Sequence, residues 1–119
     1  MTADRKRAEA LFQTALDLFA EGKNEEAVAE YQRCLALNPA HSQALHGLAR
    51  ALQELDRFDE SVAACRQLAQ LEPNDPLSFT ALSIALHKKG LIAEAELAAN
   101  QARILGWKKQ LREKKPRTI

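Results

Sequence analysis

The amino-acid sequence predicts an all-α protein in which three antiparallel helix pairs stack into a solenoid, followed by a short C-terminal capping helix. One residue pattern recurs three times, starting at Leu11, Leu45 and Phe79, which gives a 34-residue period. A period of this length is typical of stacked repeat proteins. Within each copy, apolar residues recur at helical spacing, and turn residues separate the expected helices.

Each copy combines an apolar stripe, a small residue where two helices are expected to cross, and a final turn residue. The first copy contains Leu11, Thr14, Ala15, Leu18, Ala27, Tyr31 and Pro39. The second contains Leu45, Leu48, Ala49, Leu52, Ser61, Cys65 and Pro73. The third contains Phe79, Leu82, Ser83, Leu86, Ala95 and Ala99, with Trp107 in the place of the proline. This pattern resembles the tetratricopeptide repeat, and the resemblance implies a right-handed α-solenoid.

The 119 residues are expected to form a single domain. The period divides it into repeats at 8–41, 42–75 and 76–107, and a basic capping helix with its tail occupies 108–119. A chain of this size buries roughly 60% or more of its unfolded surface on folding, which is enough for one continuous core.

The first repeat is expected to contain one helix over about 4–21 and a second helix that ends before Pro39. Gly22 follows the first helix, where the chain needs a left-handed residue that only glycine adopts without steric cost. Asn24 is expected to cap the second helix, because its side chain can accept a hydrogen bond from a free backbone N–H. Ala27 is expected to be small because the two helices cross closest there.

The second and third repeats follow the same plan, with helices expected near 42–55, 59–71, 77–89 and 91–105. Asp56 takes the place of the turn glycine in the second repeat. Since aspartate tolerates the left-handed region less well than glycine, this turn is expected to be less stable or differently shaped.

The end of the chain is expected to cap the solenoid. Gly106 is expected to end the last repeat helix, and a separate short helix follows over 107–114. Terminal repeats need a polar outer face, so Trp107 and Leu111 are expected to pack inward while the lysine and arginine side chains face water. Pro116 ends any further helix.

Charge is distributed unevenly along the chain. Residues 8–107 hold eight basic and fourteen acidic side chains, for −6, whereas 108–119 hold six basic and one acidic, for +5. The basic tail has three interpretations: a solvated helix end, docking on the acidic body of a neighbouring molecule, or contact with nucleic acid or an anionic membrane. No aromatic platform or groove-reading motif accompanies the tail, so the last interpretation is the least expected.

The two cysteines, Cys34 and Cys65, lie on apolar helix faces without CxxC spacing, which favours buried reduced thiols. The apolar run after the basic residues 5–7 is interrupted by a polar residue every four positions, as in an amphipathic helix and unlike a signal peptide. No stretch approaches the ~20 apolar residues of a membrane span. A cytoplasmic protein is therefore expected.

Catalytic and metal-binding patterns are missing from the sequence. There is no glycine-rich phosphate loop, no nucleophile with a base at a recognisable spacing, and no run of metal ligands. His41 is expected to be a surface turn residue. His46 and His87 fall on neighbouring helices, but two histidines without a third ligand make a poor zinc site. Neither enzyme activity nor a cofactor or metal is expected.

The resemblance implies that the first helix of each repeat lines a concave groove. The residues expected to contact a partner there are Phe12, Leu16, Phe19, His46, Arg50, Ile84, His87 and Lys88. The apolar members suit an amphipathic partner helix, and the two cationic members suit acidic side chains at its edge. In the alternative, the rings of Phe12 and Phe19 pack inward and belong to the core.

One subclass of the family binds the terminal carboxylate of chaperone tails through lysine, arginine and asparagine side chains. The corresponding positions in this chain are Phe12, Leu16, Gly47, Leu77 and Ala81. All of them are apolar or lack a side chain. Because no fork of donors is present for a carboxylate, this mode of binding is not expected.

The expected function is that of a protein–protein interaction module that holds a peptide or an amphipathic helix in the groove. One alternative is a self-assembling unit, in which another copy fills the groove or covers the Trp107 end. A second alternative is an adaptor that contacts an anionic surface through the basic tail. The partner's identity does not follow from the sequence.

Overall fold

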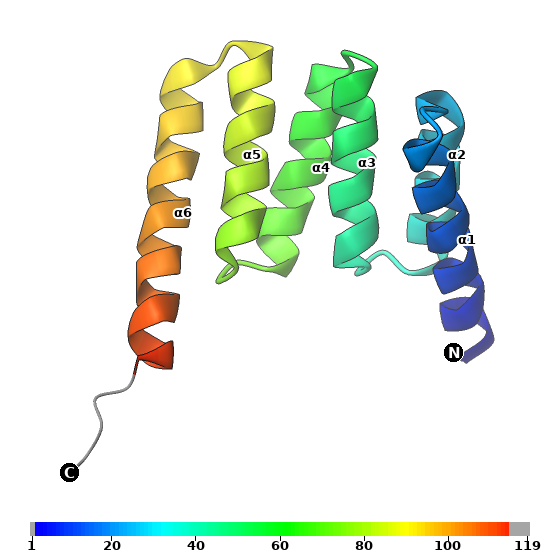
Figure 1. Ribbon diagram of the computed structural model, residues 1–119, viewed down its shortest axis with the longest axis horizontal. Coiled ribbons are helices and arrows are strands. Elements are labelled where there is room, and N and C mark those ends of the chain that lie inside the picture. Colours follow the sequence, from blue (N-terminus) through cyan, green and yellow to red (C-terminus); the bar gives the residue numbers. More distant parts are fainter. Residues whose placement is uncertain (1, 115–119) are drawn as a thin grey trace.

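The computed structural model describes residues 2–114, which form six α-helices joined by short turns (Figure 1). They form three consecutive pairs: α1 (Thr2–Ala20) with α2 (Asn24–Leu37), α3 (Ser42–Glu54) with α4 (Phe58–Leu71), and α5 (Pro76–Lys89) with α6 (Ile92–Glu113). The three helix pairs that the 34-residue period predicts are therefore present. Pro116, predicted to end the last helix, lies outside the described residues.

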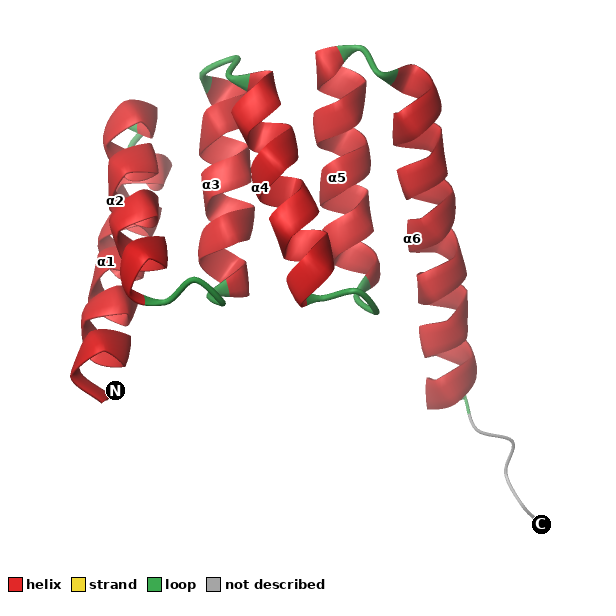
Figure 2. Ribbon diagram, turned by 180° about the vertical axis from the view of Figure 1, so that it is seen from behind, coloured by secondary structure: helices red, strands yellow, loops and turns green. Residues whose placement is uncertain are grey.

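The pairs stack in one direction and give a solenoid of 52 × 39 × 23 Å. Each helix packs against the next one along the chain, and α3 also packs against both α1 and α5. Within residues 2–114 the backbone of α4 approaches neither α2 nor α6, and exposed ion pairs such as Arg66–Glu94, at 3.3 Å, span the gap. The odd-numbered helices therefore form the inner, more closely packed layer, and the even-numbered helices form the outer layer, seen from behind in Figure 2.

The turn inside each repeat has the same shape in all three copies. Gly22, Asp56 and Gly90 have φ values of 79°, 59° and 92°, so all three lie in the left-handed region. In each copy the following N–H donates to the carbonyl five residues earlier at 2.9 Å, as from Arg57 to Leu52. The aspartate thus adopts the glycine's conformation instead of changing the turn, at the steric cost that a side chain carries there.

The second helix of the first repeat begins without the predicted side-chain cap. Asn24 is already the first residue of α2, and Lys23 occupies the cap position without a side-chain hydrogen bond. The tight turn at Gly22 leads directly into the helix, so Asn24 has no extended backbone from which to cap. Glu25 and Glu26 remain in the first turn, where their charge is favourable next to the helix dipole.

The predicted break at Gly106 does not occur. Helix α6 runs without interruption from Ile92 to Glu113, so the capping segment continues the last repeat helix instead of forming a separate one. Gly106 is not among the glycines with positive φ. Glycine permits a left-handed helix end but does not impose one, and no element follows α6 in the described residues.

The predicted packing edge at the C-terminal end is also wrong. Trp107 and Leu111 are 71% and 70% exposed, because they lie on the side of α6 opposite its buried residues. The open end of the solenoid is instead made polar by a charged residue at a register position that is apolar in the first two repeats. Val28 and Val62 are buried, whereas Glu96, the next residue in the 34-residue register, is exposed. A charged side chain there keeps the terminal repeat compatible with water.

The two helices of a repeat cross at small residues. In the second repeat the Ser61 hydroxyl on α4 donates to the carbonyl of Ala49 on α3 at 2.9 Å. In the third repeat the serine is on the first helix instead of the second: the Ser83 hydroxyl on α5 donates to the carbonyl of Ala95 on α6 at 2.8 Å. Such bonds from a short side chain to the facing backbone require a close approach. The first repeat has Ala27 at this register, and its side chain is fully buried, as a close crossing there requires.

Tyr31 and Gly47 join the first repeat to the second. Tyr31 on α2 is fully buried, and a Cβ atom placed on Gly47 of α3 would lie less than 3.0 Å from the ring carbons Cζ and Cε1 of the tyrosine. Real Cβ atoms do not approach other atoms so closely. Gly47 is therefore required by the tyrosine ring, and it does not leave space for a partner in the groove.

Gly47→Ala is expected to lower the free energy of unfolding by about 1–3 kcal/mol, because the added methyl group overlaps the Tyr31 ring. This figure is the net loss, after the ~1 kcal/mol that alanine contributes through helix propensity. Thermal or denaturant unfolding measures the change. Gly106→Ala is the matched control, since Gly106 lies inside α6 and a Cβ atom placed there would meet no neighbouring side chain or other helix within 4 Å. It is expected to stabilise by up to ~1 kcal/mol. Equal effects of the two substitutions would contradict the close contact.

Cys34 and Cys65 are free, fully buried thiols, as predicted. Burial raises the pKa of the Cys65 thiol to about 12. Burial also raises the pKa of Cys34, and the nearby Glu9 carboxylate adds to this effect. Because the thiolate is the reactive form, a disulfide reagent at mildly alkaline pH is expected to label both cysteines at the rate of unfolding. Rapid labelling without denaturant would show that these helix faces are open.

Candidate functional site

The three inner helices present one row of side chains at equivalent positions of the 34-residue repeat. Leu16 on α1, Arg50 on α3 and Ile84 on α5 occupy this row, which we call the central row. All three are exposed, with 38% of Leu16 and 47% of Ile84 accessible to solvent. Large aliphatic side chains that stay exposed at the same register of two repeats are not needed for packing between them. The row is therefore a candidate contact surface.

The central row borders a hollow of about 360 Å³ between α3 and α5, which we call the central hollow. Its walls and floor are formed by His46, Ala49, Arg50, Gln53, Glu54, Ala81 and Ile84. The two alanines provide an apolar floor, and polar groups surround it. Arg50 and Glu54 place one cation and one carboxylate in the hollow, so an apolar side chain with polar neighbours fits this arrangement.

Arg50 lies between the first repeat and the central hollow. Its guanidinium carbon is 5.4 Å from the centre of the Phe19 ring, within the range of a cation–π contact. Phe19 itself is half-buried and packs against the core. No carboxylate in residues 2–114 forms an ion pair with Arg50. The guanidinium is thus oriented by the ring while its N–H donors remain available to an acidic partner group.

His46 is half-buried beside Arg50 in the central hollow. Burial lowers the pKa of its imidazole, and the charge of Arg50 lowers it further, whereas Asp75 has the opposite effect. The neutral form of the ring is therefore favoured, and this form presents one N–H donor and one acceptor. A neutral hydrogen-bonding group beside a cation favours a polar acceptor on the bound partner.

Phe12 lies in the core instead of on the groove surface. Its side chain is only 6% exposed, and its ring centre is 6.2 Å from that of Tyr31 and 4.6 Å from that of His41. The ring fills the junction of α1, α2 and the start of α3, so it is not available to a partner in this conformation. The inward-packing alternative is the one that the structure shows for Phe12.

His41 is not the surface turn residue that its position suggests. Its Nδ1 atom accepts a hydrogen bond from the N–H of Ala44 at 3.1 Å and so caps α3. Its Nε2 atom lies 3.1 Å from a carboxylate oxygen of Glu9, and its side chain is only 10% exposed. The sequence did contain a signal for this cap. Asp75 is the equivalent residue of the next repeat and caps α5 in the same place.

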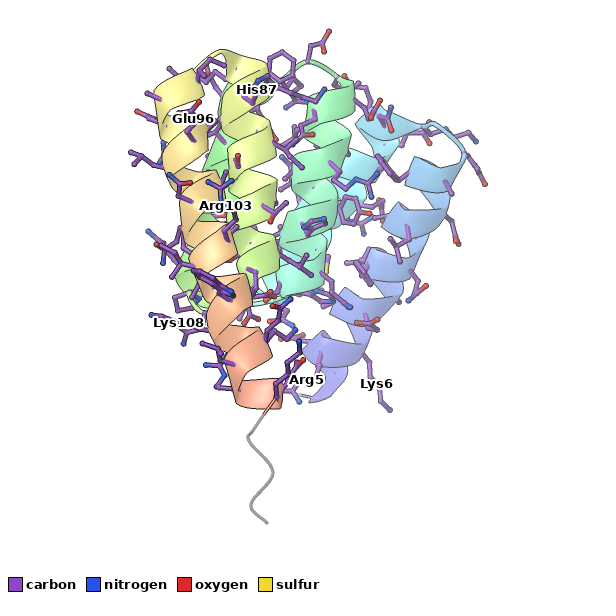
Figure 3. The ribbon with its side chains drawn as sticks, turned by 60° about the vertical axis from the view of Figure 1, so that its left-hand side comes forward. Arg5, Lys6, His87, Glu96, Arg103 and Lys108 are labelled. Atoms are coloured by element: carbon purple, nitrogen blue, oxygen red, sulfur yellow. The ribbon has the colours of Figure 1, made fainter. Side chains whose placement is uncertain are left out.

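His87 and Lys88 lie at the C-terminal end of α5, and both are exposed. Figure 3 shows His87 at this end of the helix. Neither residue lines the central hollow. Ile84, one turn earlier, also borders a second hollow of about 270 Å³. That hollow is lined in addition by Thr80, Ser83, Ala99, Ala102 and Arg103. Ile84 thus borders two depressions, while His87 and Lys88 are exposed beyond both of them.

The described part of the chain contains no cluster of histidine, cysteine, aspartate or glutamate side chains able to hold a metal ion. Nor does any helix in residues 2–114 have the length and apolar character that crossing a membrane requires.

A family model described as tetratricopeptide repeat matches residues 18–83, more than half of the sequence. The chain belongs to the tetratricopeptide repeat family. The match spans most of the first repeat, the whole second repeat and the start of the third, which agrees with the 34-residue register. No curated protein sequence is similar enough to count as a match.

Solved structures with the same fold include several tetratricopeptide repeat proteins. The second repeat domain of Spaghetti (RPAP3), bound to the HSP90 peptide SRMEEVD, is 22% identical with a TM-score of 0.80, and the alignment covers 88% of this chain and 99% of that one. The Yersinia enterocolitica translocator chaperone SycD, in complex with a peptide of YopD, is 26% identical with a TM-score of 0.77, covering 82% and 74%. MamA is 23% identical with a TM-score of 0.83, covering 89% and 62%.

His41→Ala is expected to lower the free energy of unfolding by about 1–2 kcal/mol, because it removes both the cap of α3 and the ring that covers Phe12. His41→Asn is expected to cost less, since an asparagine side chain can still cap the helix. Denaturant unfolding of the two variants measures both changes. Equal losses would mean that the cap contributes nothing, and the absence of any loss would remove the role assigned to His41.

Proposed function

We propose that this tetratricopeptide repeat protein is a protein–protein interaction module that binds a peptide or an amphipathic helix across the central row of its inner helices. The observation that carries the proposal is the exposed row of Leu16, Arg50 and Ile84 beside the central hollow. Two aliphatic side chains flank one cation whose donors have no acidic partner in residues 2–114. This arrangement suits an amphipathic helix with an acidic side chain next to its apolar face.

The contacts proposed are the three central-row residues together with Phe19, His46, His87 and Lys88. Phe19 contributes the accessible part of its ring and orients Arg50, with 5.4 Å between them. His46 supplies a neutral hydrogen-bonding group in the central hollow. His87 and Lys88 are exposed at the rim, where charges influence the association rate and selectivity more than the affinity.

Peptide binding by proteins of the same fold supports this proposal. SycD, which is 26% identical to this chain, has been solved in complex with a peptide of the translocator YopD. Recognition of a terminal carboxylate, as a clamp of basic side chains would provide, is not proposed. Leu77 and Ala81 lack donors at the basic positions of such a clamp, and Gly47 packs against the Tyr31 ring. We therefore expect the partner to be read along its length and not by its end.

We propose a binding role without catalysis, in the cytoplasm. The residues that line the central hollow include no nucleophile paired with a base, and their polar groups flank an apolar floor. Buried, free cysteines are consistent with a reducing compartment.

Leu16→Asp/Ile84→Asp is expected to reduce partner binding by at least about tenfold, because it places two charges on the apolar surface that the partner covers. The measurement is a pull-down from host lysate read by mass spectrometry, followed by titration of the captured partner. Arg50→Gln tests the cation and is expected to weaken binding most at low salt.

Ala29→Asp/Ala63→Asp is the matched control, because both alanines are exposed on the outer helices. Circular dichroism first verifies that all variants are folded. A partner that the control captures and the Leu16/Ile84 variant does not capture supports the groove. Capture of the same proteins by all variants would place binding elsewhere and contradict the proposal.

A further inference from the structure

Helix α6 carries a second apolar face that nothing in the described structure covers. Leu97, Ile104, Trp107 and Leu111 are 70%, 46%, 71% and 70% exposed. Together with Ala93 and Asn100 they form a line along the helix, which we call the outer stripe. The stripe is separate from the groove, because none of its residues lines the central hollow.

The outer stripe is particular to the third repeat. The register positions of Leu97 and Ile104 hold Ala29 and Ala36 in the first repeat, and Ala63 and Gln70 in the second. Large apolar side chains at these positions are thus not required by the solenoid, since two repeats fold without them. An exposed tryptophan and three exposed aliphatic side chains on one helix face indicate an interaction surface.

The geometry of α6 turns the stripe away from the body. Its buried residues, from Ala95 through Ala98 and Ala102 to Leu105, recur at spacings of three and four. Leu97, Ile104 and Leu111 recur at intervals of seven, and Asn100 and Trp107 follow the first two by three positions. This is the pattern of a coiled-coil seam, on the opposite side of the helix. From Ala93 to Leu111 the seam is ~27 Å long, at about 1.5 Å per residue.

The charges beside the stripe change sign along the helix. Glu94 and Glu96 flank its beginning, whereas Arg103, Lys108 and Arg112 flank its second half. Figure 3 shows Glu96 near the start of α6 and Lys108 toward its other end. All of these side chains are exposed. A surface with one sign at each end is complementary to a second copy of itself that is related by a two-fold axis.

We propose that α6 pairs with α6 of a second copy of this chain, antiparallel and around a two-fold axis level with residue 102. Each large side chain of the outer stripe then faces a different, mostly smaller one, as interdigitating helices require. The facing pairs are Leu97 with Trp107, Asn100 with Ile104, and Ala93 with Leu111.

The flanking charges favour this register on balance. Glu94 falls next to Lys108 of the second copy, and the symmetry repeats this contact at the other end. A carboxylate oxygen of Glu94 also lies 3.3 Å from Arg66 of its own chain. Because the Glu94 side chain is 53% exposed, it can accept hydrogen bonds from both Arg66 and Lys108 of the second copy. Near the axis, Arg103 faces Arg103 of the second copy. Within its own chain, each Arg103 guanidinium donates a hydrogen bond to the side-chain carbonyl of Asn100. Two opposite-charge contacts thus stand against one like-charge contact.

The charges also select the occupant. A parallel pair would place Arg103 next to Lys108 of the other copy and would bring the basic C-terminal ends together. An anionic membrane would attract the second half of the stripe, but it would repel Glu94 and Glu96 beside Leu97. The antiparallel copy offers a cation to the acidic end of α6 and a carboxylate to its basic end. The resulting pair carries two central rows, so that a partner with two binding segments gains avidity.

The first test measures the mass of the full chain by sedimentation velocity over a wide concentration range. The expected result is a reversible transition from the mass of one chain to twice that mass. Leu97→Asp/Ile104→Asp is expected to remain monomeric with unchanged circular dichroism, because both side chains are exposed. The groove variant Leu16→Asp/Ile84→Asp is expected to dimerise like the wild type. A monomer at every concentration, or dimers lost only in the groove variant, would overturn the proposal.

The second test determines the orientation by disulfide cross-linking. Leu97→Cys chains mixed with Trp107→Cys chains are expected to cross-link, whereas neither chain alone does so, and the native cysteines are buried. A cross-link between two Leu97→Cys chains would indicate a parallel pair and overturn the antiparallel arrangement. Arg103→Gln is expected to tighten the dimer, because it removes the like-charge contact at the axis. A monomer in solution that binds anionic lipid vesicles through α6 would replace the second copy by a membrane.

Discussion

The close crossing of the two helices within each repeat is the constraint on which the rest of the structure depends. It requires a small residue on both helices, and in the second and third repeats a serine hydroxyl also bonds to the backbone of the facing helix. The serine is on α4 in one repeat and on α5 in the other, so the two repeats solve the same problem with opposite partners. A larger side chain at either position would force the helices apart. The 34-residue register would then no longer align the next pair.

Alignment between repeats creates the central row. The Tyr31 ring fills the space that Gly47 leaves between the first and second repeats, and this contact fixes how α3 sits against α2. Once the inner helices are aligned, equivalent positions of successive repeats form rows, and the central row is one of them. Arg50 is then held over Phe19, 5.4 Å away, although the two residues belong to different repeats. The site is therefore a product of stacking and not of any single repeat.

The two faces of α6 illustrate how a terminal repeat departs from the internal ones. Toward the open end, Glu96 takes the register position of two buried valines and keeps that end polar. On the outer side, the opposite substitution has occurred, and large apolar residues replace alanine, glutamine and proline. A helix that only closed the solenoid would need the first change. The second change gives α6 a surface suited to contact with another molecule.

The sequence by itself determined the repeat period, the three helix pairs, the left-handed turn at Gly22 and the burial of both cysteines. These features follow from local propensity and apolar periodicity, which act over a few residues. Only the tertiary structure decided that Phe12 and His41 pack on each other, because their contact joins α1 to the start of α3. The tertiary structure also decided that α6 passes straight through Gly106, since glycine permits a left-handed helix end but does not impose one. The periodicity of α6 fits two opposite apolar faces, and only the packing of the body shows which face is buried.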